Sequence, residues 1–142
     1  MSIDLITDLP LSNKYDAIFT IMNQGCSKMA KFIPYNKTID GQNVAHLYFQ
    51  HLFPWFRILK HIISDQGPCF TSHFSIAVCK ATGIQQNINI AFHPCTNGQI
   101  EQMNLWVENY LKEFVSACQN DWSTFLPMVE FAHNSWRYVL EY

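Results

Sequence analysis

The chain has 142 residues, of which 49% are hydrophobic and 15% aromatic, so it is long and apolar enough to form one packed domain. No segment approaches the roughly 18 apolar residues of a membrane span, and acids stand where a signal peptide would be basic, so we expect neither a membrane protein nor a secreted one. The net charge is −2 and the 9 lysines and arginines are scattered singly, so charge alone does not indicate a nucleic-acid partner. The 5 cysteines contain no CxxC pair, which argues against a structural zinc site and favours free thiols.

The first part of the chain predicts three strands and a helix. Its apolar segments are rich in aromatic and β-branched residues and are separated by turn signals, among them Pro10 and the polar stretch NQGCSK. Further along, apolar residues recur every three or four positions, which is the pattern of one helix face, and Asp40 or Gly41 stands near its start. The predicted elements are strands over 2–6, 15–22 and 29–35 and a helix over 40–55.

The second part predicts strands that alternate with helices. The segment ILKHIIS is short and β-branched, as a buried strand should be, and Gly83 follows a helical pattern that Thr71 or Ser72 can cap. The predicted elements are a strand over 58–64, a helix over 71–82, a strand over 88–92, a helix over 98–118 and a last helix from 121, with a kink or break expected at Pro127. This order predicts an α/β domain with a mixed sheet, in which three hairpin-like strands precede parallel crossovers.

Three acidic residues stand at positions where a carboxylate needs an explanation. Asp4 lies within the first predicted strand, Asp65 directly follows the strand at 58–64, and Glu101 lies just inside the long helix. A buried carboxylate costs free energy unless a cation meets it, and a divalent cation would stabilise several acids at once. The residues also allow other interpretations, in which Asp4 is an edge-strand acid, Asp65 a turn or helix cap, and Glu101 a partner in a capping box.

Several sequence blocks point to a known family. The stretches SIDLI, YDAIFTIMNQGCSKMAKFIP, ISDQGPCFTSHF, FHPCTNGQIEQMN and WSTFLPMVEFAHNS together resemble the catalytic core of retroviral and gypsy-type LTR-retrotransposon integrases. The three acids are separated by 60 and 35 residues, and the second spacing, beside a match to HPxTxGQxE, is that family's signature. The resemblance covers nearly the whole chain.

The resemblance implies both a fold and an activity. The fold would be ribonuclease H-like, with a mixed five-stranded sheet flanked by helices, and the activity that of a polynucleotidyl transferase for DNA integration. Asp4, Asp65 and Glu101 would be the catalytic and metal-binding triad, with two Mg²⁺ or Mn²⁺ ions about 4 Å apart. Such a site trims a DNA 3′ end with water and then joins the new hydroxyl to target DNA.

The resemblance also indicates binding partners and a cellular location. The partners would be element-end DNA and target DNA, bound by a homodimer or a larger assembly, in the nucleus and without any membrane. Residues 1–142 are expected to form a single core domain that lacks the end of its last helical region, the family's N-terminal zinc domain and its C-terminal DNA-binding domain. The residues expected to contact nucleic acid are His93, Asn97, Gln99, Asn104 and Lys112.

The chain departs from the family at positions that bear on DNA contact. Relatives commonly read VDRLSK where this chain has MNQGCSK, and they carry basic residues after the glutamate where this chain has Gln102 and Leu105. A helical wheel places Leu105 nearly opposite the apolar face of the helix. Three hypotheses therefore stay open, namely an integrase core, a catalytically silent module that binds nucleic acid or protein, and a ribonuclease H-like nuclease.

Overall fold

The computed structural model covers the chain from Met1 to Tyr142 and describes most of it. The described residues are 2–23, 27–38, 41–51, 61–64, 73–74, 76–78, 80, 89–92 and 98–140.

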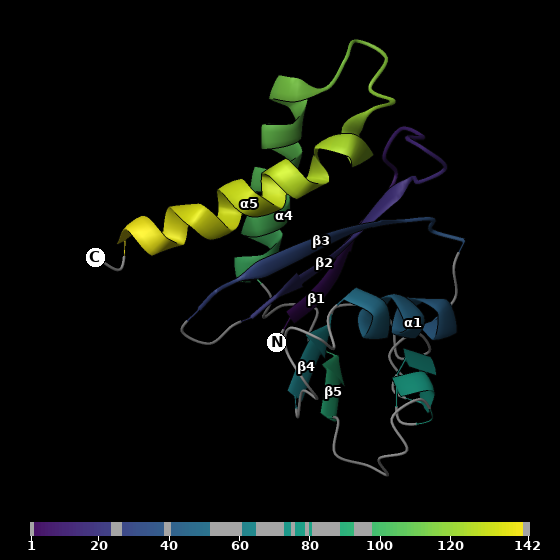
Figure 1. Ribbon diagram of the computed structural model, residues 1–142. Coiled ribbons are helices and arrows are strands. Elements are labelled where there is room, and N and C mark those ends of the chain that lie inside the picture. The colour runs from purple at the N-terminus through teal and green to yellow at the C-terminus, as the bar shows by residue number, and fades with distance from the viewer. Residues whose placement is uncertain are drawn as a thin grey trace.

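Five strands form one mixed sheet in the order β3-β2-β1-β4-β5 (Figure 1). Neighbours β1 with β2 and β2 with β3 are antiparallel, whereas β1 with β4 and β4 with β5 are parallel. Consecutive strands are joined directly in the antiparallel part, whereas longer connections precede β4 and β5 in the parallel part, as the order of the elements predicts. The strands are β1 (Ser2–Ile6), β2 (Ala17–Met22), β3 (Ala30–Tyr35), β4 (His61–Ser64) and β5 (Asn89–Phe92).

The strand β2 begins two residues later than predicted because a tight turn precedes it. Ser12 and Tyr15 exchange two backbone hydrogen bonds of 2.8 Å, and Asn13 and Lys14 between them have φ values of 49° and 75°. Positive φ at both central residues is the geometry of a two-residue hairpin turn, which asparagine adopts readily. The hydroxyl of Ser12 also accepts a hydrogen bond from the Ser123 backbone at 3.1 Å, so this turn caps the last helix.

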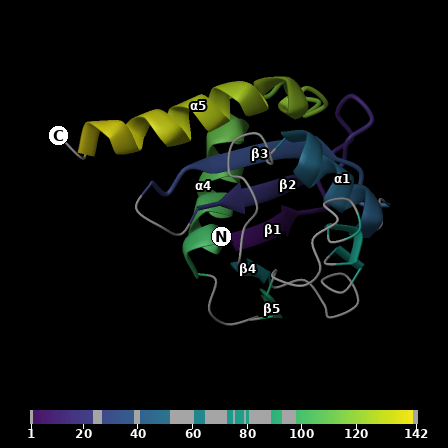
Figure 2. The same ribbon diagram turned by 60° about the horizontal axis from the view of Figure 1, so that its bottom comes forward.

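In the described part of the chain, three long helices surround the sheet. They are α1 (Gly41–His51), α4 (Gly98–Phe114) and α5 (Trp122–Leu140). In Figure 2, α1 and α4 lie on opposite faces of the sheet, and α5 runs alongside β3. Between β4 and β5 the structure describes short helical pieces within 73–80, in the region where a helix is predicted. Among the described residues, no helix is long and apolar enough to cross a membrane.

One predicted helix end is wrong, and so is the break that was one of two alternatives predicted at Pro127. The helix α4 ends at Phe114 rather than near Cys118, and a turn follows in which the Asp121 carboxylate accepts the Ser116 backbone N–H at 3.0 Å. Cys118 is an exposed free thiol beyond the helix. The helix α5 runs through Pro127 as one element instead of breaking there.

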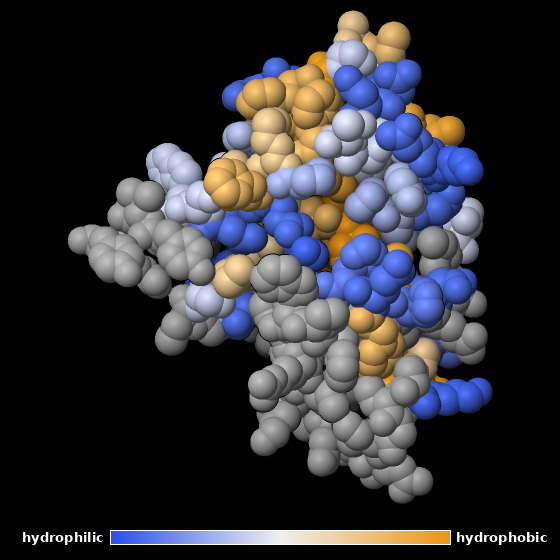
Figure 3. Space-filling model, in the orientation of Figure 1, coloured by the Kyte–Doolittle hydropathy of each residue, from blue (hydrophilic) through white to orange (hydrophobic). Residues whose placement is uncertain are grey.

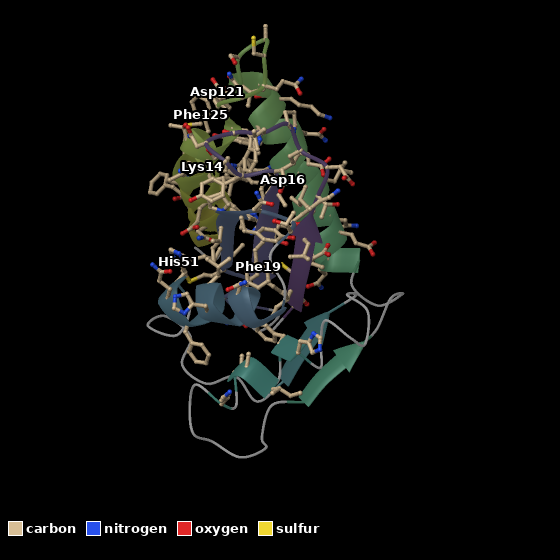
Figure 4. The ribbon with its side chains drawn as sticks, turned by 90° about the vertical axis from the view of Figure 1, so that its right-hand side faces the viewer. Lys14, Asp16, Phe19, His51, Asp121 and Phe125 are labelled. Atoms are coloured by element: carbon tan, nitrogen blue, oxygen red, sulfur yellow. The ribbon has the colours of Figure 1, made fainter. Side chains whose placement is uncertain are left out.

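The alternation of side chains along the strands builds a separate core on each face of the sheet. On the α1 side, Phe19 is fully buried and packs in a cluster with Ile3 and Ile33, and Figure 4 shows Phe19 near α1. On the other side, Ile6 and Ile18 pack against α4 and α5. Because successive residues of β1 point to opposite faces, Asp4 shares the α4 side with Ile6.

Side chains of α5 occupy the outer edge of β3. Asn134 accepts a hydrogen bond from the Ala30 backbone N–H at 2.9 Å and donates one to the Ala30 carbonyl at 3.0 Å. The Glu130 carboxylate accepts from the Phe32 backbone at 3.2 Å and pairs with Lys31 at 3.1 Å. These contacts cover backbone groups that would otherwise be open to another strand.

Candidate active site

Asp4 is a buried carboxylate that accepts hydrogen bonds from its own strand and from α4. It lies in the middle of β1 with a relative exposure of 7%. Its Oδ1 accepts from the Leu5 backbone N–H at 2.8 Å, and its Oδ2 accepts from Nδ2 of Asn104 on α4 at 2.5 Å. The Thr20 hydroxyl donates to the Asp4 carbonyl at 3.0 Å, which ties this point of β1 to β2. The orientation of the carboxylate is therefore set from both the strand and the helix.

Glu101 lies on the first turn of α4, one turn before Asn104. Residues three apart share one side of a helix, so the helix that contacts Asp4 also carries Glu101 near the same place. The Glu101 side chain is exposed, whereas its neighbour Ile100 is fully buried in the core beneath α4. Burial of Ile100 anchors the first turn against the sheet and leaves the Glu101 carboxylate accessible.

The second acid of the predicted triad, Asp65, lies outside the described residues. The strand that precedes it in sequence is placed next to β1, with Ile63 opposite Ser2 and Ser64 opposite Ile3. The described end of β4 is therefore level with the residue before Asp4. Because parallel strands place their carboxyl ends at one edge of the sheet, ligand sites gather in such positions.

The residues predicted to contact nucleic acid have different surroundings. His93 and Asn97 lie outside the described residues. Gln99 is exposed and its Oε1 accepts from the Lys28 ammonium at 3.0 Å, and Lys112 is exposed further along α4. Asn104, by contrast, is only 8% exposed and faces Asp4. Nucleic-acid contact stays a prediction for all five residues.

The oxygen atoms at this site are suitable ligands for a hard divalent cation. Carboxylate and carboxamide oxygens are the ligand types that Mg²⁺ and Mn²⁺ prefer. Oδ1 of Asn104 is buried and has no hydrogen-bond partner in the described part of the chain, so an acceptor oxygen is left unused beside the Asp4 contact. Within the described residues, no three His, Cys, Asp or Glu side chains converge as a metal site, and Asp65 is not among those residues.

The negative charge of Asp4 affects the pKa of a buried tyrosine on the other side of the sheet. Tyr35, at 3% exposure, has its pKa raised to about 12 by burial first, then by the negative charges of Asp16 and Asp4. Tyr35 also lines a groove of about 610 Å³ between β3, the end of α1 and α5, which His51 borders (labelled in Figure 4).

The contact between Asn104 and Asp4 was not predicted from the sequence, although the position of Asn104 on its helix indicates that it needs a partner. Asn104 is four residues after Ile100 and three before Val107, so it falls on the buried side of α4. A polar residue in an apolar helix face needs a buried partner. That partner is 100 residues away in sequence, so the helix pattern alone cannot identify it.

Comparison with known proteins finds relatives in sequence and in shape. No family model matches the chain. The transposon Tf2-3 and Tf2-4 polyproteins of Schizosaccharomyces pombe are each 30% identical to it over 135 residues, which is 95% of this chain and 10% of the polyprotein. The chain therefore spans about a tenth of the length of the polyproteins that it matches.

Two solved structures of similar shape are integrase catalytic core domains. One is the catalytic core domain of HTLV-2 integrase, in complex with magnesium and in a trimeric form, with a TM-score of 0.64 and 16% sequence identity. The match covers 92% of this chain and 82% of the HTLV-2 chain. The other is the catalytic core domain of BIV integrase, with a TM-score of 0.58 and 21% sequence identity. The match covers 92% of this chain and 81% of the BIV chain.

These findings confirm the fold class and the resemblance. The chain has the ribonuclease H-like fold of integrase catalytic cores, with the mixed five-stranded sheet that the sequence predicts. Over nearly its whole length it is similar to a segment of transposon polyproteins.

Proposed function

We propose that the chain is the catalytic core of a metal-dependent DNA integrase and acts as a polynucleotidyl transferase. The observation that carries this proposal is the buried Asp4 carboxylate, held where β4 ends and where α4 begins with Glu101. The relationship to transposon polyproteins supports it at the level of the family.

The proposed chemistry divides between the ions and the chain. Two Mg²⁺ or Mn²⁺ ions held by Asp4, Asp65 and Glu101 would activate a water or a DNA 3′ hydroxyl and stabilise the leaving oxygen. The Leu5 backbone and Asn104 orient the Asp4 carboxylate, and the exposed Glu101 is accessible to the substrate side. In each step one phosphorus–oxygen bond forms and one breaks, so no nucleophilic side chain is needed.

The proposed partners are DNA and further copies of the chain. Element-end DNA and target DNA would bind at the start of α4, in the nucleus. A homodimer or larger assembly is supported by the dimeric and trimeric forms described for the HTLV-2 core. It is also supported by apolar side chains on the outward side of α5, where Phe131 is 72% and Trp136 69% exposed. Figure 3 shows hydrophobic surface over the region of α4 and α5.

A catalytically silent module with the same fold is the second candidate. Leu105 favours it, because this side chain is 58% exposed one turn beyond Glu101, where relatives carry a basic residue. Such a module would bind nucleic acid or protein without cutting or joining DNA.

One experiment separates these functions from each other and from a ribonuclease H-like nuclease. Purified protein is incubated with labelled DNA duplexes that carry candidate terminal repeats, and in parallel with RNA–DNA hybrids, in the presence of Mn²⁺. An integrase core shortens or joins the DNA, a nuclease cleaves the hybrid, and a silent module does neither. Asp4→Asn is the control that must remove any product, since a contaminating nuclease would be unaffected.

A further inference from the structure

Asn104 is a polar residue in an apolar setting. On α4 it lies among Ile100, Met103 and Val107, each at most 5% exposed, and it is itself 8% exposed. Burial of an amide group is unfavourable unless its donors and acceptors are satisfied. The nitrogen of this side chain is satisfied by Asp4, whereas its oxygen has no partner among the described residues.

The contact holds the Asp4 carboxylate without neutralising it. Oδ1 of Asp4 accepts a hydrogen bond from the Leu5 backbone and Oδ2 accepts one from Asn104, and both donors are uncharged. A lysine or arginine in place of Asn104 would also donate, but its positive charge would compete with a metal ion for the carboxylate. A neutral donor fixes the orientation of Asp4 and leaves its negative charge for a ligand.

The oxygen of Asn104 indicates that something completes this site. Oδ1 belongs to the same small, planar carboxamide as the nitrogen that contacts Asp4, so it lies close to that contact. A buried carbonyl without a partner is rare in folded proteins and is tolerated where a bound ion or its water supplies the missing interaction. An acceptor oxygen beside a carboxylate is suited to a divalent cation.

We propose that Asn104 is a positioning residue of the active site, which orients Asp4 by a neutral hydrogen bond and thereby sets the affinity for a divalent cation. This inference rests on the proposed function. It differs from a direct nucleic-acid contact, because it acts through Asp4, and from a purely structural role, because it predicts a change in metal binding.

The test is a set of thermal melts over a Mn²⁺ titration. Asn104→Leu removes the donor at similar volume, and Asn104→Asp replaces the donor by a second carboxylate. Asn109→Asp is the matched control, since it adds the same charge at an exposed position of the same helix. The double variant Asp4→Asn with Asn104→Asp restores an amide–carboxylate pair with the two partners exchanged.

If Asn104 positions Asp4, the variants should differ both in stability and in their response to Mn²⁺. Without metal, Asn104→Asp melts several degrees below wild type and Mn²⁺ raises its melting temperature more than it raises that of wild type, whereas Asn109→Asp behaves as wild type. Asn104→Leu needs about ten times more Mn²⁺ than wild type for the same gain in melting temperature, which is about 1.4 kcal/mol of binding free energy. The exchanged pair melts near wild type without metal but gains less from Mn²⁺.

Other outcomes separate this inference from the proposed function. Asn104→Leu with the Mn²⁺ dependence of wild type would overturn the positioning role while leaving the metal-dependent function intact. Should wild type itself gain nothing from Mn²⁺ while Asn104→Asp still melts low without metal, the metal-dependent function and the metal-affinity role of Asn104 both fail, and only its contact with Asp4 stands. Asn104→Asp and Asn109→Asp that melt alike without metal would show that the contact itself is absent in solution.

Discussion

The buried and outward sides of α4 differ in more than polarity. The buried side is apolar except for Asn104, which contacts Asp4, and on the outward side Leu105, which is 58% exposed, stands among polar residues. Each exception is poorly explained by the packing around it. A residue that breaks the pattern of its own helix side is a candidate for binding, because packing does not require it.

The largest expected effect comes from removing the charge that the buried side contacts. Asp4→Asn keeps the size of the side chain but loses the carboxylate, so strand transfer should fall by at least about a thousandfold, or about 4 kcal/mol in the barrier. The stabilisation of wild type by Mn²⁺ should disappear as well. Product formation and melting temperature are measured together. Asp8→Asn, at an exposed aspartate just after β1, is the control and should change neither.

The next effect compares packing on the two sides directly. Ile100→Ala leaves a cavity at a fully buried position and should cost about 2–5 kcal/mol of unfolding free energy. Leu105→Ala, five residues along the same helix, should change it by less than about 0.5 kcal/mol because its side chain is exposed. Chemical denaturation measures both variants. Equal losses would mean that Leu105 is covered in solution, for example by a second copy of the chain.

Tyr35 offers a probe of the Asp4 charge through the sheet. Its pKa is raised to about 12, so the folded state holds this proton more tightly than the unfolded state. The corresponding stability is fully present below pH 10 and is lost as the pH rises from about 10 to 12, by at most about 3 kcal/mol. The difference between wild type and Tyr35→Phe in alkaline melts isolates this loss. Asp4→Asn should lower the pKa of Tyr35 and reduce the loss, and an unchanged titration would mean that the charge of Asp4 does not reach Tyr35.

The smallest effect concerns the outward side. Leu105→Arg places a positive charge one turn beyond Glu101 and should tighten duplex DNA binding by about 1 kcal/mol at low salt. It should steepen the logarithmic salt dependence by about one unit, since one more phosphate is contacted. Titrations at several salt concentrations measure both quantities, and a thermal melt checks that the fold is unchanged. An unaltered affinity would remove this side of α4 from the path of the DNA.

The local pattern of the sequence determined the elements of this fold. The three early strands and the strands around residues 61–64 and 89–92 follow from short apolar runs rich in β-branched and aromatic residues. The buried side of α4 follows from the 3.6-residue period of its apolar residues, which backbone geometry fixes. The family blocks identified Asp4 and Glu101 as candidates, and the structure puts both beside the contact of α4 with β1. The role of Asp65 stays a prediction.

The tertiary structure decided what depends on contacts between distant residues. The helix α4 stops at Phe114 because Asp121 binds the turn that follows, and α5 continues through Pro127 because Leu126 and Val129 on either side of it are buried in the core. A propensity is a small free-energy difference, which burial of neighbouring side chains overrides. The bond from Asn104 to Asp4 joins residues 100 positions apart. Periodicity places each of them on the correct side of its own element, but only the packing of α4 across β1 makes them partners.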